Sequence, residues 1–169
     1  GGGPCAYNPE PLADFFDLFY IGEGETSYDA LLDLYKEWKK GDASREAFLH
    51  QAAKIPGIYV PSLYEVSYKE DGTLASMEPV YDDIPKKIEK QVVTELTASV
   101  YPDKPVVPFL KVTQDRVVLE VQRGCIRGCR FCQAGMIYRP LREKDVERLK
   151  RQADIMFVSY THLRAHETL

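Results

Sequence analysis

Three of the four cysteines in this chain, Cys125, Cys129 and Cys132, lie within eight residues of one another. They follow the pattern C-x3-C-x2-C inside the stretch RGCIRGCRFCQAG, and the fourth cysteine, Cys5, lies far upstream. Crowded cysteines without an export signal more often serve metal or redox chemistry than disulfide pairing. The fold must therefore present this stretch as one loop on which three thiols can meet.

Predicted regular structure flanks the cysteines on both sides. Before them, DRVVLEVQRG contains an apolar run at 117–121 that is typical of a buried strand. After them, REKDVERLKRQA predicts a helix with Val146, Leu149 and Ala153 on one face. Strand, loop and helix follow in the order of one βα unit, so we expect the α/β fold class.

Three thiolates on one loop can converge on a single metal centre. Structural zinc normally takes four protein ligands, so a zinc site here needs a distant residue such as His50. A [4Fe–4S] cluster can be held by three thiolates with its fourth iron left open for a small molecule. Gly124 and Gly128 suit a backbone that curls around such a cluster. The remaining alternative is that the three cysteines are buried thiols whose proximity is a coincidence.

The loop closely resembles the signature of the radical SAM superfamily, C-x3-C-x-φ-C, where φ is aromatic and is Phe131 here. The resemblance implies a [4Fe–4S] cluster on Cys125, Cys129 and Cys132, after the first strand of a (β/α) barrel. It also implies that S-adenosylmethionine binds the open iron, with Phe131 against its adenine. Reductive cleavage would then give methionine and a 5′-deoxyadenosyl radical, with an electron from a reductant such as flavodoxin or ferredoxin.

The N-terminal stretch GGGPCAYNPEPLADFFDLFYIGEGE is similar to the end of a Rossmann-like cobalamin-binding domain. This resemblance implies that Gly2 and Gly3 let a cobalamin cofactor approach the backbone. Within the stretch, DLFYIGEGE is a short apolar run ended by glycines, which is typical of a buried parallel strand. VPSLYEV and RGCIRGCRFCQAGMIYRPLREK are similar to a family of cobalamin-domain radical SAM proteins. The cobalt-ligating histidine loop and the second SAM-contacting glycine-acid segment of such proteins are missing from this sequence.

Local signals place the other elements. Asn8 is predicted to cap a short helix that begins at Pro9, and Thr26 with Asp29 has the spacing of a capping box. Apolar residues at helical spacing predict a helix that ends near Gly41. A second helix is expected over 44–54.

The segment after this second helix contains Asp71-Gly72 between two β-prone runs, which predicts a hairpin. The proline-rich segment from Pro79 to Pro108 is expected to be an extended connector.

These expectations divide the chain into four segments. Residues 1–41 are expected to be the C-terminal part of the cobalamin-binding-like domain, and 42–110 a connector with a helix and a hairpin. Residues 111–155 are expected to begin the radical SAM core. The segment 156–169 lacks a helix or strand period and is expected to be a non-native tail, so the chain is expected to be truncated at both ends.

The histidines of the tail, His162 and His166, are assigned no metal. A complete barrel needs about 200 residues or more, so we expect catalysis from the parent protein and not from this fragment alone.

Charge and hydropathy restrict the partners. The chain has no apolar run of about 18 residues and no signal peptide, so we expect a cytoplasmic protein without a membrane partner. Nine Lys or Arg and three Asp or Glu lie between Arg123 and Arg151, a local net charge of +6. The alternative to an enzyme is therefore a cysteine-rich zinc or cluster module that contacts RNA. The two hypotheses overlap if the substrate of the enzyme is tRNA.

Overall fold

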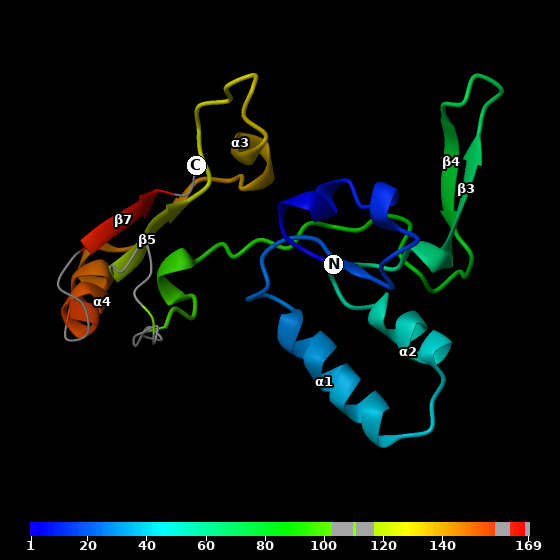
Figure 1. Ribbon diagram of the computed structural model, residues 1–169, viewed down its shortest axis with the longest axis horizontal. Helices are drawn as coiled ribbons and strands as arrows, with labels where there is room; N and C mark the ends of the chain where they lie inside the picture. The colour runs from blue at the N-terminus through cyan, green and yellow to red at the C-terminus, as the bar shows by residue number, and fades with distance from the viewer. Residues whose placement is uncertain (103–109, 111–116, 158–162, 168–169) are drawn as a thin grey trace. The chain divides into compact units, whose positions relative to one another are not determined.

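The computed structural model describes residues 1–102, 110 and 117–157, and the backbone of 163–167. The chain divides into two compact units, Gly1–Val93 and Thr94–Leu169 (Figure 1). Helices and strands occur together in the described residues, which is consistent with the expected α/β class. No described helix is long and apolar enough to cross a membrane.

In the first unit, the helices α1 (Tyr28–Lys40) and α2 (Arg45–Ala52) pack together through aromatic side chains. The rings of Trp38 and Phe48 lie 5.0 Å apart, and the Trp38 indole N–H donates to the Ala43 carbonyl. Ser44 caps α2 by accepting a hydrogen bond from the Ala47 amide at 3.2 Å. Both predicted helices are confirmed, and Gly41 occupies the C-cap of α1.

The core of the first unit surrounds a short strand pair. Strand β1 (Phe19–Tyr20) pairs antiparallel with β2 (Ile58–Tyr59), and all four residues are buried. The predicted parallel strand is therefore wrong, because an apolar run indicates burial but not the direction of its partner. The predicted end of a Rossmann-like domain gains no support from this pairing.

Two further predictions about the N-terminal segment are wrong. Instead of a helix capped by Asn8, the chain forms 3-10 turns at Pro4–Tyr7 and Glu10–Leu12. Pro9 and Pro11 lack amide protons, which disfavours a longer helix.

The Thr26–Asp29 capping box does not form either, because α1 begins at Tyr28 with Ser27 at its N-cap. Thr26 Oγ1 donates instead to the Glu23 carbonyl, and Ser27 Oγ donates to the Pro56 carbonyl.

The predicted hairpin is confirmed: β3 (Tyr64–Tyr68) and β4 (Leu74–Pro79) pair antiparallel around Asp71-Gly72 (Figure 1). The Asp71 carboxylate stabilises the turn by accepting from the Thr73 amide at 2.9 Å. The chain that follows contains turns and the 3-10 helix Leu96–Ala98 over its described part, and residues 103–108 lie outside the described residues, so the extended connector stays a prediction. Gln91 fixes this connector to the first unit through a parallel bridge with Gly22.

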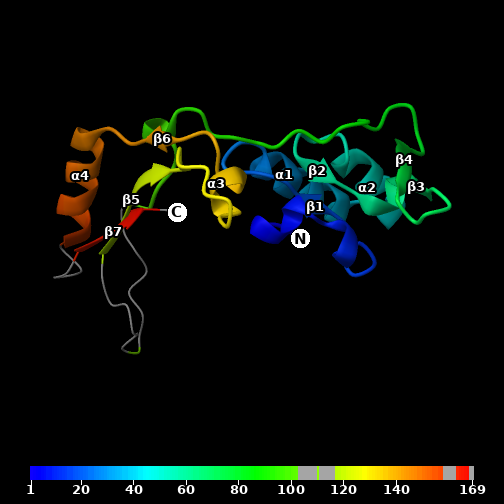
Figure 2. The same cartoon turned by 90° about the horizontal axis from the view of Figure 1, so that it is seen from above.

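The second unit contains a sheet with strand order β6-β5-β7. Strand β5 (Val117–Arg123), which confirms the predicted strand, pairs antiparallel with β6 (Arg142–Glu143) and parallel with β7 (Leu163–Glu167). A short helix, α3 (Ala134–Ile137), lies between β5 and β6 in sequence, and α4 (Val146–Phe157) between β6 and β7. Figure 2 shows α4 beside the β5–β7 pair. The parallel strands and the helix between them have the order of a βαβ unit.

The sequence places the start of α4 too early. Residues 142–143 form β6, and α4 begins after Asp145, whose carboxylate accepts from the Arg148 amide at 3.0 Å as an N-cap does. Val146 is 60% exposed, so it does not share the buried face of α4, on which Gln152 and Met156 lie.

The absence of regular structure after Ile155 is also a wrong prediction. Helix α4 continues to Phe157, and 163–167 form β7. Strand pairing uses backbone groups, so it needs no periodic side chains. Whether 156–169 are native to the protein stays a prediction, as do the four predicted segments.

Candidate functional site

The cysteines lie on residues 124–141, named here the cysteine loop, which joins β5 to β6 and includes α3. In Figure 1 its first part is the yellow segment between β5 and α3. Cys129 is exposed, Cys125 and Cys132 are half-buried, and all three thiols are free. The strand that precedes the loop and the pairing that follows it thus present three accessible thiols on one excursion of the chain.

Backbone hydrogen bonds order the interior of the loop. The Arg127 amide donates to Cys125 Sγ at 3.4 Å, and the Cys132 amide donates to the Cys129 carbonyl at 3.1 Å. The hydrogen bond from this amide holds Cys125 Sγ against the backbone of the loop, and sulfur is the atom through which cysteine binds metals. Gly128 has a φ of 66°, so the backbone turns there through a conformation that other residues rarely adopt.

The base of the loop is closed by close backbone contacts. Gly124 has a φ of 93°, and a Cβ atom added to it would lie 2.4 Å from the Pro140 carbonyl oxygen and 2.5 Å from that of Tyr138. The Arg142 guanidinium donates to the same two carbonyls, from Nε to Pro140 at 2.9 Å and from Nη2 to Tyr138 at 3.0 Å. The chain leaving the loop therefore lies directly against the residue that precedes Cys125.

A charged cluster lies next to this base. Arg123 Nε donates to Glu120 Oε1 at 2.8 Å, and Lys144 Nζ lies 3.1 Å from Glu120 Oε2 and 4.0 Å from the centre of the Tyr101 ring. Burial raises the pKa of Glu120, but Arg123 and Lys144 outweigh burial and hold this pKa below its ordinary value. The Glu120 carboxylate therefore stays charged and connects β5 to the start of α4.

The three cysteine thiols are suitable metal ligands, although the structure does not place them together around one point. Within the described ranges, no three His, Cys, Asp or Glu side chains lie together as ligands for one metal ion. Metal sites in proteins commonly form only when the metal binds, because the ligands must deprotonate and come together. Three accessible thiols, with an amide directed at one of them, meet the chemical requirement for a thiolate-bound metal or cluster.

The other predicted site residues are placed as follows. Phe131 is 92% exposed, between Cys129 and Cys132, so its ring is free to cover a ligand at the loop. Gly2 and Gly3 are exposed, and nothing lies within 4 Å of a Cβ atom added to Gly3. An exposed backbone at these glycines is compatible with a nearby cofactor but does not identify one.

His50, the distant residue considered as a zinc ligand, lies in the first unit and is paired there. His50 Nε2 lies 3.0 Å from Asp83 Oδ2, and Lys54 Nζ lies 2.8 Å from the same oxygen. The hydrogen bonds from Lys54 and His50 lower the pKa of Asp83 to about 2. His162 lies outside the described residues, and His166 is described for its backbone alone.

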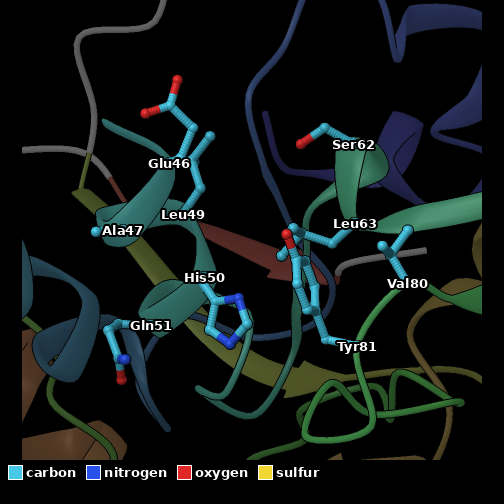
Figure 3. Close-up of a pocket in the computed structure, with 9 residues that line it drawn as sticks. All are labelled: Glu46, Ala47, Leu49, His50, Gln51, Ser62, Leu63, Val80 and Tyr81. Carbon is cyan, nitrogen blue, oxygen red and sulfur yellow. The ribbon is translucent and has the colours of Figure 1, made fainter. Parts of the chain in front are cut away.

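His50 also lines a pocket of about 560 Å³ in the first unit, between α2 and the base of the hairpin. Figure 3 shows its imidazole beside Tyr81, edge to face, with ring centres 4.8 Å apart. The pocket walls are mainly apolar, with Leu49, Leu63 and Val80 around the two rings. The pocket contains no cysteine, so its chemistry is separate from that of the cysteine loop.

Sequence reasoning misses the residues that close the base of the loop. Arg142 and Lys144 were assigned to a helix, whereas both are buried beside β5. One signal could have identified a partner for them: Glu120 is a carboxylate inside the otherwise apolar run 117–121, and a buried carboxylate needs a cation.

Comparison with known proteins supports one part of the sequence interpretation. Residues 1–61 match a family described as "Radical SAM proteins, N-terminal", which supports membership of the radical SAM superfamily. The chain is also 30% identical over 159 residues to an uncharacterized protein of Methanocaldococcus jannaschii. That match covers 94% of this chain but 27% of the relative, so the chain spans about a quarter of the length of that protein. No solved structure matches the chain significantly.

Proposed function

We propose that this chain is part of a radical SAM enzyme, and that Cys125, Cys129 and Cys132 hold its [4Fe–4S] cluster. One observation carries the proposal: the match to a radical SAM N-terminal family and the C-x3-C-x2-C loop occur in the same chain, in separate stretches. The match covers residues 1–61 and does not include the cysteines. The two signals are therefore independent, and each raises the weight of the other.

Each residue of the loop has a defined role in this proposal. The three thiolates of Cys125, Cys129 and Cys132 bind three irons, and the exposed Phe131 ring packs against the adenine of S-adenosylmethionine. The Arg127 amide orients Cys125 Sγ through the hydrogen bond between them. When bound, such a cluster supplies one electron for the reductive cleavage of S-adenosylmethionine, which begins radical chemistry on the substrate.

The proposal extends to partners of the parent protein. The electron comes from a one-electron donor such as flavodoxin or ferredoxin, in the cytoplasm. A cobalamin cofactor near Gly2 and Gly3 would supply a methyl carrier, and the open backbone at these glycines leaves room for it. The substrate is left open, with tRNA as one candidate.

The test is anaerobic reconstitution of the 169-residue chain with iron and sulfide, followed by EPR spectroscopy after reduction. We expect a reduced [4Fe–4S] signal that changes when S-adenosylmethionine is added. Replacing any one loop cysteine by alanine, as in Cys129→Ala, should remove this signal and most of the bound iron. Cys5→Ala is the matched control and should bind iron like the unaltered chain, because Cys5 lies outside the loop.

Two results would contradict the proposal. One is iron and sulfide binding that does not depend on the loop cysteines. The other is stoichiometric zinc binding with no cluster under any reconstitution condition. A cluster that forms but does not respond to S-adenosylmethionine would support the ligand assignment alone and move the SAM test to the full-length protein.

A second candidate function, an RNA-contacting module, is favoured by the exposed arginines of the loop. Arg127, Arg130 and Arg139 are all exposed beside the cysteines. Such a module would bind RNA with an affinity that falls steeply as salt concentration rises, because phosphate contacts release counterions. Charge reversal at Arg127 and Arg130 would weaken this binding and reduce its salt dependence. Salt-independent binding would count against it.

A further inference from the structure

We infer that Arg142 is a positioning residue for the three thiols, because it closes the base of the cysteine loop through contacts that involve no metal. The inference rests on the proposed function only in that the thiols of the loop bind a metal. It concerns Arg142, a residue whose own side chain is not a metal ligand.

The contacts of Arg142 span the exit of the loop. Its side chain is buried, with 8% of the residue exposed. Its guanidinium donates to the Pro140 carbonyl from Nε and to the Tyr138 carbonyl from Nη2. A guanidinium presents several N–H groups in a fixed plane, so it can hold two carbonyls at once, whereas a lysine ammonium is a point charge on a flexible stem.

The same two carbonyls lie against the entrance of the loop. A Cβ atom on Gly124 would approach both of them within 2.5 Å, so the backbone of Gly124 and the Tyr138–Pro140 segment are in close contact. Gly124 immediately precedes Cys125. By fixing residues 138–140, Arg142 therefore fixes the chain that follows the third cysteine against the chain that carries the first.

Strand pairing brings Arg142 to this position. Arg123 and Arg142 are partners in the β5–β6 pair, and the Lys144 amide continues the pairing by donating to the Val121 carbonyl at 2.9 Å. The two ends of the loop are therefore joined by backbone pairing and not by the thiols. Gathering three sulfurs then requires rearrangement within the loop, and the entropy cost of closing its ends has already been met by folding.

The test uses cobalt(II) as the probe and the whole 169-residue chain. Co²⁺ bound to thiolates absorbs light, so a titration gives its dissociation constant. We expect Arg142→Lys and Arg142→Gln each to raise this constant by about 10-fold or more, as loss of residues that orient metal ligands typically does. Arg142→Lys keeps the positive charge, so a loss of affinity there reports geometry. Arg151→Lys, at an exposed position on α4, is the matched control and should bind Co²⁺ normally.

A second measurement separates positioning from general stability. In the metal-free chain, Arg142→Lys should accelerate hydrogen exchange at the Arg127 and Cys132 amides and leave the α4 amides unchanged. Unaltered exchange at the loop amides together with an unaltered Co²⁺ dissociation constant would overturn the inference. So would a parallel loss of protection in α4, since Arg142 would then hold the whole unit and not the loop.

The two proposals can fail separately. If the unaltered chain does not bind Co²⁺ through its thiols, the proposed metal function fails. The exchange of the loop amides in Arg142→Lys still decides whether Arg142 closes the loop.

Discussion

Two glycines show how the surroundings of a residue determine the free-energy cost of adding a side chain there. Gly72 and Gly124 have positive φ angles of 79° and 93°. At Gly72, in the hairpin turn, a Cβ atom would meet nothing within 4 Å. At Gly124 it would meet two carbonyl oxygens that the Arg142 guanidinium also holds. At Gly72, only the backbone conformation therefore favours glycine. At Gly124, the neighbouring carbonyls also leave no room for a side chain.

This difference predicts the effects of the two alanine substitutions. Gly72→Ala should cost about 1–2 kcal/mol, the strain of a left-handed conformation in a residue with a side chain. Gly124→Ala adds a clash with fixed carbonyls and should cost about 2–5 kcal/mol in the second unit. Hydrogen exchange in the β3–β4 and β5–β6 pairs measures each effect locally. Equal costs at the two positions would show that Gly124 is not confined by Tyr138 and Pro140.

At the residue scale, the sequence predicts the candidate ligands but not the contacts that hold them. The three candidate ligands can be predicted because metal ligation depends on residue type and spacing, and the pattern C-x3-C-x2-C contains both. The role of Arg142 cannot be predicted in this way, because it depends on two carbonyls that lie near its guanidinium only when the loop returns to β5. Every residue has a backbone carbonyl, so the residue types of the partners do not show that a side chain donates hydrogen bonds to them.

At the element scale, the sequence predicts the helices and strands that depend on local caps and turns. It does not predict those that depend on pairing with a distant strand. Helix α2 carries its own N-cap at Ser44, and the β3–β4 hairpin carries its own turn at Asp71. The direction of β1 depends on which strand pairs with it, and β6 is a strand only because it pairs with β5. The start of α4 shifts for the same reason, because pairing takes residues 142–143 before the helix can include them.

Helix α4 contains a polar residue whose burial predicts a stabilising change. Gln152 is 1% exposed, and neither its side-chain oxygen nor its nitrogen has a hydrogen-bond partner among the residues that the structure describes. A buried polar group without a partner costs about 1–3 kcal/mol. Gln152→Leu should therefore increase the protection of the α4 amides from hydrogen exchange by about this free energy.

The control for Gln152→Leu is Arg151→Leu, which makes a similar change at the next position, where the side chain is exposed. Exposed substitutions usually change stability by no more than about 0.5 kcal/mol. A destabilising effect of Gln152→Leu would indicate that the amide has a partner that stabilises the helix.

At the scale of the whole molecule, the two units have different chemistry. Residues 1–93 include the match to the radical SAM N-terminal family and the pocket beside His50, whereas the three clustered cysteines belong to the second unit. The first unit has its own core of twelve buried residues, which includes the β1–β2 pair, Ala52 and Ala53 at the end of α2, and Val60 after β2. The boundary between the two units, after Val93, lies inside the segment 42–110 that the sequence predicts to be a connector.

The first unit should fold on its own, because 93 residues with a continuous core exceed the size of about 40 residues below which chains usually need metals or disulfides. The only tryptophan, Trp38, lies in this unit and packs against Phe48, which borders the core, so its fluorescence reports the packing of this unit. We expect residues 1–93 to show the Trp38 emission of the whole chain and to lose it cooperatively in urea. Phe48→Ala should lower the urea midpoint, whereas Phe15→Ala, at a position that is 81% exposed, should leave it nearly unchanged. If residues 1–93 emit like an unfolded peptide, the core requires the second unit, and the division into independent units is wrong.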